Sequence, residues 1–174
     1  MVILTDWKRH FPLPIIRSGQ EQAIEFALEA FKTKKYVVLE APTGAGKSMI
    51  GITIARALTK FSLDPDCKSG SYFLTTQKML QDQYLSDFAP PKGNLLSIKS
   101  ATNFQCSHHT ERTCSESKSA LNILGTQAYG TQWFRTCMNQ CPYKKAKKDF
   151  VEGTEGVTNY SYFLLDSKLD KRQL

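Results

Sequence analysis

EAPTGAGKSMI, residues 40–50, is a glycine-rich turn that lies between an apolar run and a helical pattern. Gly44 and Gly46 allow a positive φ and let backbone N–H groups come close to a ligand. Together with the N-terminus of the following helix, these N–H groups make a cradle for phosphate oxygens. The stretch therefore predicts a phosphate-binding loop between a strand and a helix.

Two side chains of this loop have the chemistry that ATP requires. Lys47 would reach the β- and γ-phosphates, and the Ser48 hydroxyl would bind Mg²⁺, so these two are the expected catalytic residues. The strict pattern has glycine at position 41, where Ala41 also leaves room for the turn. The alternative, a glycine-rich connection with a chance Lys-Ser pair, fits the flanking strand and helix less well. The expected nucleotide-binding residues of the loop are Thr43, Gly44, Ala45, Gly46, Lys47 and Ser48.

The segments around the loop alternate between strand and helix patterns. A parallel sheet covered by helices is the fold that such an alternation favours. The expected elements, in chain order, are a helix at 20–32, a β-branched strand at 36–40, a helix at 47–61, a strand at 71–76, a helix at 77–88, a turn at 90–94, a short strand at 95–99 and a strand followed by a helix from residue 155.

Composition places the chain among soluble globular proteins. Its 174 residues suffice for one domain with an insertion, and 41% are hydrophobic and 22% charged. No apolar run reaches the roughly 18 residues that span a bilayer, and the N-terminus is no signal peptide. We therefore expect an intracellular protein, cytoplasmic or, in a eukaryote, nuclear, without disulfides. The net charge of +7 favours a polyanionic partner such as nucleic acid.

Four of the five cysteines lie between residues 100 and 150, where the chain is polar and has little periodicity. Their spacing is Cys106-x7-Cys114-x22-Cys137-x3-Cys141. Four thiolates can hold a [4Fe–4S] cluster or a tetrahedral Zn²⁺ ion. Because only the last pair is close, the spacing weakens the zinc interpretation without excluding it, and unligated cysteines are a third reading. Cys67 lies in a polar loop and is expected to have no part in the site.

The residues near the cysteines have two interpretations each. His108 and His109 could join a mixed zinc site, but two exposed loop histidines are the favoured reading. The basic run at 144–148 either follows the phosphates of a single strand or is a solvated helix face. The aromatic residues of this region either stack on bases or, as the favoured reading, form its core; they are Tyr129, Trp133, Phe134 and Tyr143.

An ordered set of motifs resembles a known family. From about residue 11 to the end, the chain contains RSGQ, EAPTGAGKS, SYFLTTQKMLQDQ, four cysteines and VTNYSYFLL in that order. The set resembles the iron–sulfur superfamily 2 DNA helicases (the XPD/DinG/FancJ group). In this resemblance, the residues Asn103 to Cys106 are similar to those around the first cluster ligand of that family, and Cys141-Pro142-Tyr143 is similar to those around the last one.

The resemblance implies roles for particular residues. Gln20, helped by Arg17, would recognise adenine, and alanine at position 41 is usual in the family. Thr75 and Thr76 would lie near the DNA backbone. The implied cofactors are ATP, Mg²⁺ and a [4Fe–4S] cluster, and the implied partner is single-stranded or forked DNA, with no membrane. The implied cluster ligands are Cys106, Cys114, Cys137 and Cys141, and the candidate DNA contacts on the basic run are Lys144, Lys145, Lys147 and Lys148.

The expected fold class is α/β: an incomplete RecA-like parallel sheet with an inserted small iron–sulfur domain. Residues 1–99 would begin the ATP-binding domain, 100–150 would be the insertion, and 151–174 would return to the sheet, ending before the family's Asp-Glu-Ala-His box. No Asp-Glu dipeptide occurs in the chain. The expected function is therefore that of an N-terminal part of a 5′–3′ DNA helicase that binds ATP and DNA but does not hydrolyse ATP alone, a second polypeptide supplying the missing motor parts. The alternative is a zinc-containing ATP- and nucleic-acid-binding module without motor activity.

Overall fold

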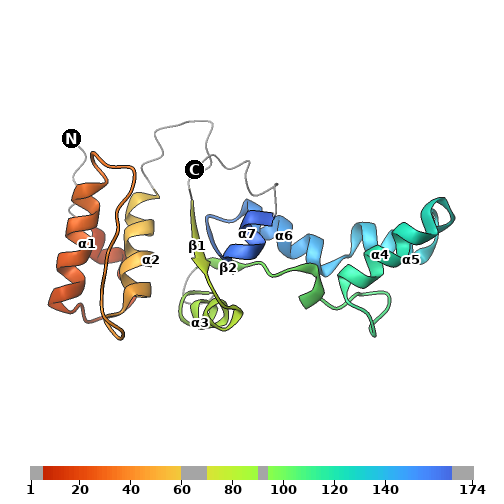
Figure 1. Cartoon of the computed structure of the whole chain (residues 1–174), viewed down its shortest axis with the longest axis horizontal. Helices are drawn as coiled ribbons and strands as arrows, with labels where there is room; N and C mark the ends of the chain where they lie inside the picture. The colour runs from red at the N-terminus through yellow and green to blue at the C-terminus, as the bar shows by residue number, and fades with distance from the viewer. Residues whose placement is uncertain (1–5, 60–69, 90–93, 166–174) are drawn as a thin grey trace. The chain divides into compact units, whose positions relative to one another are not determined.

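The computed structural model describes residues 6–59, 70–89 and 94–165, and the chain divides into two compact units, Met1–Ser71 and Tyr72–Leu174 (Figure 1). Each unit is described by itself. Cys67, most of the turn expected at 90–94 and the C-terminal segment 166–174 lie outside the described residues. Within the described part, no helix is both long and apolar enough to cross a membrane.

The first unit is helical where the sequence predicts helices. It contains the 3-10 helix η1 (Trp7–His10) and the helices α1 (Ser18–Ala30) and α2 (Lys47–Leu58). Apolar residues at helical spacing on α1 and α2 face each other and pack with the aromatic rings of the N-terminal segment. The buried residues of this core are Trp7, Phe11, Ile24, Ala27, Leu28, Ile50, Ile54 and Ala57.

The strand predicted at 36–40 is wrong for this structure. The segment has no regular secondary structure, and Tyr36 and Val38 are 88% and 91% exposed. A strand exists only where a neighbouring backbone completes its hydrogen bonds. Among the described residues of the first unit, no segment provides that pairing. The β-branched residues favour an extended strand, but no described segment of this unit pairs with them to form a sheet.

The second unit is built on a three-stranded parallel sheet with the order β1-β3-β2. Its strands are β1 (Ser71–Thr75), β2 (Leu95–Ser97) and β3 (Glu155–Asn159). Strands β2 and β3 run parallel, with Leu95 opposite Glu155 and Ser97 opposite Val157. The helices α3 (Lys78–Phe88) and α7 (Tyr160–Leu165) follow β1 and β3. These elements confirm the strand and helix patterns of 71–88, 95–99 and 155–165.

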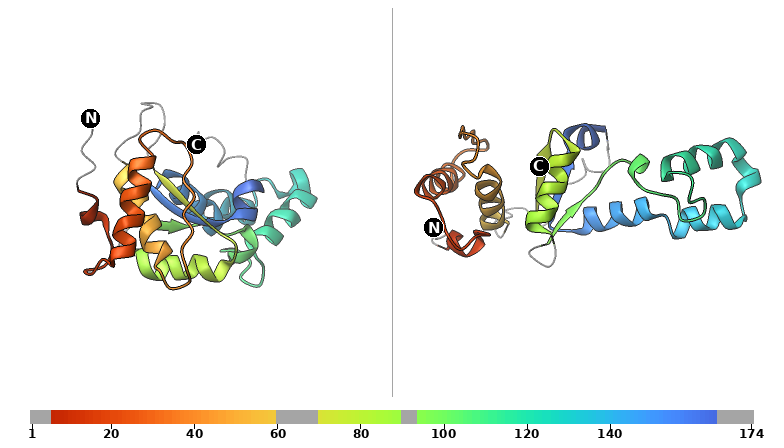
Figure 2. Two further views of the ribbon diagram at one scale, coloured as in Figure 1. Left: turned by 60° about the vertical axis from the view of Figure 1, so that its left-hand side comes forward. Right: turned by 90° about the horizontal axis from the view of Figure 1, so that it is seen from below.

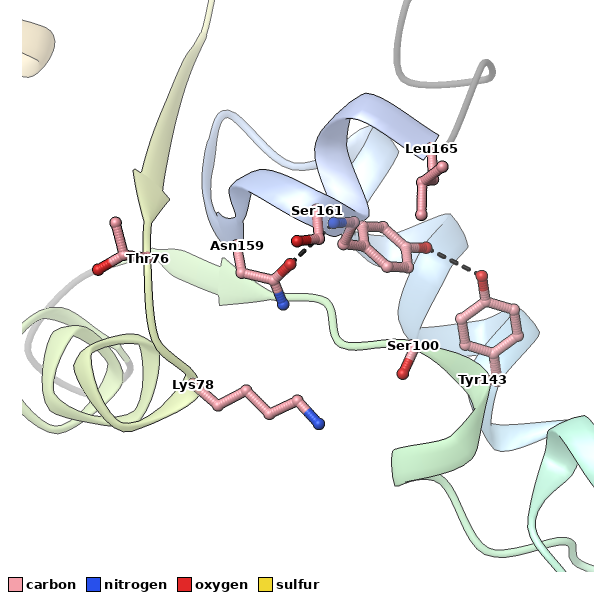
Figure 3. Close-up of a pocket in the computed structure, with 8 residues that line it drawn as sticks. Thr76, Lys78, Ser100, Tyr143, Asn159, Ser161 and Leu165 are labelled. Atoms are coloured by element: carbon pink, nitrogen blue, oxygen red, sulfur yellow. Dashed lines mark hydrogen bonds between the residues drawn. The ribbon is translucent and has the colours of Figure 1, made fainter.

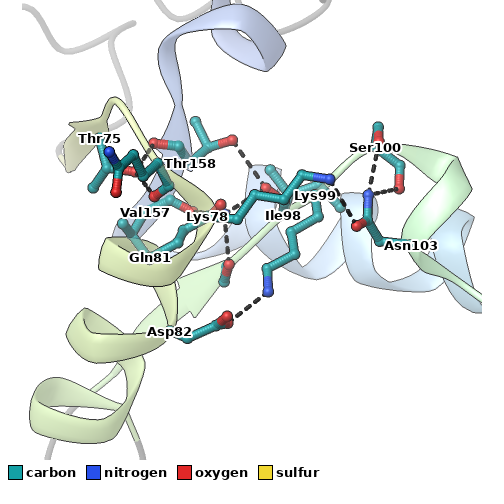
Figure 4. Close-up of polar contacts among 12 residues, drawn as sticks. Thr75, Lys78, Gln81, Asp82, Ile98, Lys99, Ser100, Asn103, Val157 and Thr158 are labelled. Atoms are coloured by element: carbon teal, nitrogen blue, oxygen red, sulfur yellow. Dashed lines mark hydrogen bonds and ion pairs between the residues drawn. The ribbon is translucent and has the colours of Figure 1, made fainter.

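A buried amide fastens α3 to the sheet. Gln81 is fully buried, and its Nε2 donates to Ser97 Oγ at 2.8 Å and to the carbonyls of Ile98 and Val157 at 2.8 and 3.2 Å (Figure 4). Thr158 Oγ1 donates to the Ile98 carbonyl at 2.9 Å. Because buried polar groups are costly without partners, this network ties the start of α3 to β2 and β3.

The core of the second unit is aromatic. Phe150 is fully buried and stacks on Tyr72, with ring centroids 5.3 Å apart. A Cβ on Gly156 would lie 2.5 Å from the Phe150 ring, so glycine is required where strand β3 passes this ring. Ile98 and Tyr162 complete the buried part of the cluster. The packing places the C-terminal end of the insertion directly against the sheet.

The segment between β2 and β3 is more regular than its weak periodicity indicates. Thr113 and Thr131 cap α4 and α5 by accepting backbone N–H bonds, and Pro142 is the first residue of α6. These local signals begin helices where the apolar pattern is faint. Figure 2 shows α6 leading from the sheet to the part that holds α4 and α5. The elements are η2 (Ala101–Asn103), α4 (Cys114–Leu124), η3 (Gly125–Ala128), α5 (Gln132–Asn139) and α6 (Pro142–Glu152).

Candidate functional site

The loop at 41–46 turns at the two glycines that the sequence analysis singled out. Gly44 and Gly46 have φ values of 81° and 78°, in the left-handed region that favours glycine. Gly46 is the N-cap of α2, so Lys47 and Ser48 begin the helix. Backbone N–H groups therefore gather at the positive end of a helix dipole, next to a lysine and a serine.

Arg17 and Gln20 hold this loop. Gln20 is 5% exposed; its Oε1 accepts from the Arg17 N–H at 3.1 Å and its Nε2 donates to the Ala45 carbonyl at 3.0 Å. Arg17 Nη1 donates to the Gly44 carbonyl at 3.2 Å. A Cβ on Gly46 would lie 2.3 Å from Gln20 Nε2. Both ends of the Gln20 amide are thus engaged with protein, and its role towards adenine stays a prediction.

Lys47 folds back over the loop. Its Nζ donates to the carbonyls of Ala41 and Pro42 at 2.9 and 3.0 Å. The side chain is exposed, as is Thr43, while Ser48 is half-buried. Phosphate oxygens are charged and accept from an ammonium more strongly than carbonyls do. A bound nucleotide would therefore draw Lys47 away from these two carbonyls.

The four cysteines of the insertion line one cavity of about 200 Å³. Cys106 and Cys114 are buried and Cys137 and Cys141 half-buried, and all four are free thiols. The Cys114 and Cys141 sulfur atoms are 3.8 Å apart. The four residues come from the loop after η2, the first turn of α4, α5 and the start of α6. The fold thus brings together residues that are far apart in the sequence.

Backbone N–H groups surround these sulfur atoms. The N–H groups of His108 and His109 donate to Cys106 Sγ at 3.4 and 3.5 Å. Burial raises the pKa of Cys106, but these bonds, led by that of His109, and the Ser117 hydroxyl bring the pKa below its ordinary value. Both histidines approach Cys106 through the backbone. The mixed zinc reading of their rings gains no support from these contacts.

Two other thiols are held neutral by their surroundings. Burial, followed by the neighbouring cysteines, raises the pKa of Cys114 to about 11, against a backbone bond from Tyr143 that lowers it. Burial and the nearby Cys106 and Cys141 also raise the pKa of Cys137. A cavity that crowds several thiols in this way favours their ionised forms only when a cation lies among them.

The described residues contain no group of three or more His, Cys, Asp or Glu side chains placed to hold one metal ion. Tetrahedral zinc, with Zn–S bonds of about 2.3 Å, needs every pair of sulfur atoms to be about 3.8 Å apart. The Cys114–Cys141 pair has this separation, but no third ligand completes a single-ion site with it. The arrangement is a shared thiol cavity rather than a closed single-ion site.

The phosphate loop, the sheet and the cysteine cavity all lie within one matched region. Residues 14–160 match the family model described as type III restriction enzyme, res subunit. The chain belongs to this family. The res-subunit family gives the matched region a helicase-like ATP-binding domain of superfamily 2, and the parallel sheet is consistent with part of a RecA-like domain. Neither a curated protein nor a solved structure is significantly similar to the chain. The match does not single out iron–sulfur helicases, so that finer resemblance remains a proposal.

The res-subunit chain has a polar cavity of about 510 Å³ at the carboxyl ends of β1 and β3 (Figure 3). Thr76 follows β1 and Asn159 ends β3, where ligands of parallel sheets usually bind. Sequence reasoning named Thr76 and, as a residue that could stack on bases, Tyr143, but it missed the other lining residues, although polar residues directly after predicted strands were a usable signal. The lining residues are Thr76, Lys78, Ser100, Tyr143, Asn159, Ser161, Tyr162 and Leu165.

The other threonine named for DNA contact is turned inward. Thr75 is 6% exposed, and its hydroxyl donates to the Gln77 carbonyl at 3.1 Å and lies 3.4 Å from that of Thr158. In this structure Thr75 stabilises the end of β1. Thr76 is exposed and is the better placed of the two.

The basic run lies on α6, as the helix-face reading expects. Lys144, Lys145 and Lys148 are exposed, and Lys147 is half-buried. The Lys148 ammonium is 3.9 Å from a Glu152 carboxylate, and Lys144 Nζ is 3.4 Å from the Met138 sulfur. Tyr143, which precedes this run on the same helix, lines the polar cavity, and Lys144 lines the cysteine cavity. DNA contact by these lysines stays a prediction.

Proposed function

We propose that this chain is the ATP- and DNA-binding part of an ATP-dependent DNA helicase whose insertion is held together by a [4Fe–4S] cluster. The observation that carries the proposal is the cavity that Cys106, Cys114, Cys137 and Cys141 share. The chain belongs to the res-subunit family, and the four cysteines lie in the segment that connects strands β2 and β3 of the parallel sheet.

The four thiols can supply one thiolate ligand to each iron of a [4Fe–4S] cluster. Ligands of such a cluster stand further apart than those of one zinc ion, so Cys114 and Cys141, whose sulfur atoms are 3.8 Å apart here, would have to separate when a cluster binds. The donors at the sulfur atoms of Cys106 and Cys114 also fit, because N–H groups stabilise anionic, metal-bound sulfur. When bound, the cluster would supply the cross-link that an insertion with so small a core needs.

The nucleotide would bind at the loop of the first unit. The N–H groups of residues 44–48 and Lys47 would hold the phosphates, and Ser48 would bind the Mg²⁺ ion. Arg17 and Gln20 would keep the loop in its binding conformation through the contacts described above. No Asp-Glu dipeptide is present to orient the attacking water. We therefore infer ATP binding without turnover by this chain alone.

DNA would follow the polar cavity beside Thr76 and the ammonium groups of α6. Lysine side chains on an exposed helix face suit a phosphate backbone, and the cavity offers hydroxyl and amide groups from Ser100, Asn159 and Ser161. The polarity that the helicase resemblance implies is 5′ to 3′, with single-stranded or forked DNA as the substrate.

Metal and sulfide content after anaerobic purification tests the proposal. We expect about four irons and four sulfides per chain and an absorption band near roughly 400 nm. Cys141→Ser should abolish all three signals, whereas Cys67→Ser, a control at the cysteine that is not among the four proposed ligands, should retain them. One zinc and no sulfide would contradict the cluster and support the zinc-containing module without motor activity.

A further inference from the structure

We propose that four neighbouring side chains of the cysteine-bearing insertion form a base-stacking site for single-stranded DNA. They are named the Trp133 cluster here and consist of His108, His109, Arg112 and Trp133. None of the four lines the cysteine cavity or the polar cavity described above. The inference rests on the proposed function, because it gives the bases of the bound strand a place that neither the cysteine spacing nor the family match indicates.

The rings of the cluster are arranged around the Trp133 indole. The His109 ring centroid lies 4.7 Å from that of the indole, at an interplanar angle of 88°. The His108 ring is nearly parallel to the indole, at 10°, with the centroids 6.4 Å apart. The Arg112 guanidinium lies 5.9 Å from the indole centroid. Edge-to-face, parallel and cation–π contacts together hold these planes at fixed angles to one another.

The loop that carries the two histidines and the arginine is closed by backbone hydrogen bonds. Gln105 and Thr113 form an antiparallel bridge at its base. Within the loop, the Cys106 N–H donates to the Arg112 carbonyl at 2.9 Å, and the Arg112 N–H donates to the His109 carbonyl at 3.0 Å. The loop therefore has a defined conformation before any ligand binds, and binding avoids the entropy cost of ordering a flexible loop.

The cluster is open to solvent. His108 is exposed, the side chains of Arg112 and His109 are 45% and 33% exposed, and Trp133 is half-buried. The indole Nε1 atom is buried, so the part of this side chain that reaches solvent consists of carbon. A hydrophobic core would bury these rings. Aromatic carbon, imidazole rings and a guanidinium that reach solvent side by side are instead typical of sites that stack bases.

The charges of the cluster favour a base over a phosphate. The Glu111 carboxylate lies 3.9 Å from Arg112 Nε and 3.4 Å from His109 Nδ1. A phosphate at this place would be repelled by the carboxylate, whereas the uncharged face of a base would not. Aromatic and guanidinium planes stack on every base, because every base has a π-face. The strand is single, since a duplex hides the faces of its bases.

Stacking and phosphate contact have different signatures in a binding experiment. Loss of a stacked base, or of the ring on which it stacks, weakens binding about fivefold or more. The dependence of the affinity on salt concentration keeps its slope, because that slope counts phosphate contacts. A purely structural role of Trp133 predicts something else: its loss would weaken the binding of a normal strand and of a strand without bases to the same extent.

Tryptophan fluorescence of the full chain tests the site directly. The chain has two tryptophans, and Trp7→Phe leaves Trp133 as the single reporter. We expect a thymidine oligonucleotide of about 15 nucleotides to quench this fluorescence. An abasic oligonucleotide of equal length and charge should leave the fluorescence unchanged and bind about fivefold more weakly, or worse. Circular dichroism shows whether the variant is folded.

Substitutions assign the effect to the cluster. In fluorescence anisotropy titrations with labelled strands, Trp133→Ala should lose about fivefold or more in affinity for the thymidine strand, with an unchanged salt slope and no loss for the abasic strand. Trp133→Phe keeps a ring and should lose less. Gln132→Ala, at the exposed neighbouring position of α5, is the matched control and should bind both strands as the wild type does.

The outcomes separate the stacking site from the proposed function. A thymidine strand that binds without quenching, and no more tightly than the abasic strand, would overturn the site and leave the proposed function standing. Quenching by a blunt duplex as strong as that by the single strand would do the same. No binding of either strand, even at low salt, would overturn both the site and the proposed DNA binding. Quenching by the thymidine strand alone, with the loss of affinity confined to the Trp133 variants, supports both.

Discussion

At the scale of single residues, two positions of the phosphate loop depend on the absence of a Cβ atom. Gly46 combines a positive φ with a close approach of the Gln20 amide, while Gly44 has the same backbone conformation and open space around it. Both positions need glycine because φ is positive there. Position 46 also needs it because a Cβ atom would collide with the Gln20 amide. The amide of Gln20 is therefore part of the loop as well as a candidate for reading the base.

Gly46→Ala should weaken nucleotide binding more than Gly44→Ala does. Both changes place an L-residue at positive φ, which costs about 1–2 kcal/mol each, but the Cβ at position 46 also collides with Gln20 Nε2. In the double variant Gly46→Ala/Gln20→Ala, the part of the loss that comes from the collision should be recovered. Titration of a fluorescent ATP analogue and urea unfolding measure both effects. Equal losses in the two single variants would contradict the role of Gln20.

At the scale of elements, the insertion depends on helix starts rather than on apolar faces. At α4, Thr113 Oγ1 accepts from the Glu116 N–H at 3.2 Å and Glu116 Oε2 accepts from the Thr113 N–H at 2.7 Å. Because Cys114 is the first residue of this helix, the capping box also positions one of the thiols. The Thr113 backbone N–H, followed by its hydroxyl, lowers the pKa of Glu116.

Thr113→Ala should destabilise the first turn of α4 by about 1 kcal/mol. Hydrogen exchange of the α4 amides should then be faster at neutral pH, whereas Thr110→Ala, a change at an exposed residue outside the cap, should leave the exchange unchanged. The capping box should also weaken in acid. A lowered pKa of Glu116 in the folded chain gives stability above the unfolded value, and that stability disappears as pH falls through the folded value. Protection factors correct the exchange for the intrinsic pH dependence of amides. Glu116→Gln should remove the acid dependence of protection in the first turn of α4, and protection that still falls in acid in that variant would contradict the assignment.

At the scale of the whole molecule, the net charge of +7 is spread over both units, but the proposed DNA contacts are local. The exposed lysines of α6 follow Tyr143, which lines the polar cavity of the second unit, while an equal set, Lys32, Lys34 and Lys35, follows α1 in the first unit. If DNA binds only through the net charge, the two sets of lysines contribute equally to its affinity. If the phosphate backbone follows a specific path along α6, the lysines of α6 contribute more.

Replacement of Lys144, Lys145 and Lys148 by alanine should weaken binding of a single-stranded oligonucleotide and flatten its salt dependence by about 0.7 units of log–log slope for each lost phosphate contact. Replacement of Lys32, Lys34 and Lys35 by alanine changes the net charge equally and should have a much smaller effect. Fluorescence anisotropy over a series of salt concentrations gives both slopes. Equal slopes for the two triple variants would show that only net charge matters.

The sequence by itself determined the features that depend on neighbouring residues. Gly44, Gly46, Lys47 and Ser48 follow from backbone conformation and charge, and α1, α2 and α3 follow from apolar residues at helical spacing. Such patterns are readable because the interactions that produce them lie within a few residues. The composition of the insertion pointed to four cysteines but hid its helices, since these begin at caps with little apolar periodicity.

Only the tertiary structure decided what depends on distant segments. The residues at 36–40 have the composition of a strand, but pairing is a property of two segments, and the described part of their unit offers no second one. The convergence of Cys106, Cys114, Cys137 and Cys141 on one cavity, the engagement of Gln20 with the loop and the burial of Thr75 have the same origin. Each depends on contacts between residues that are far apart in the sequence, and only the packing of the folded chain determines such contacts.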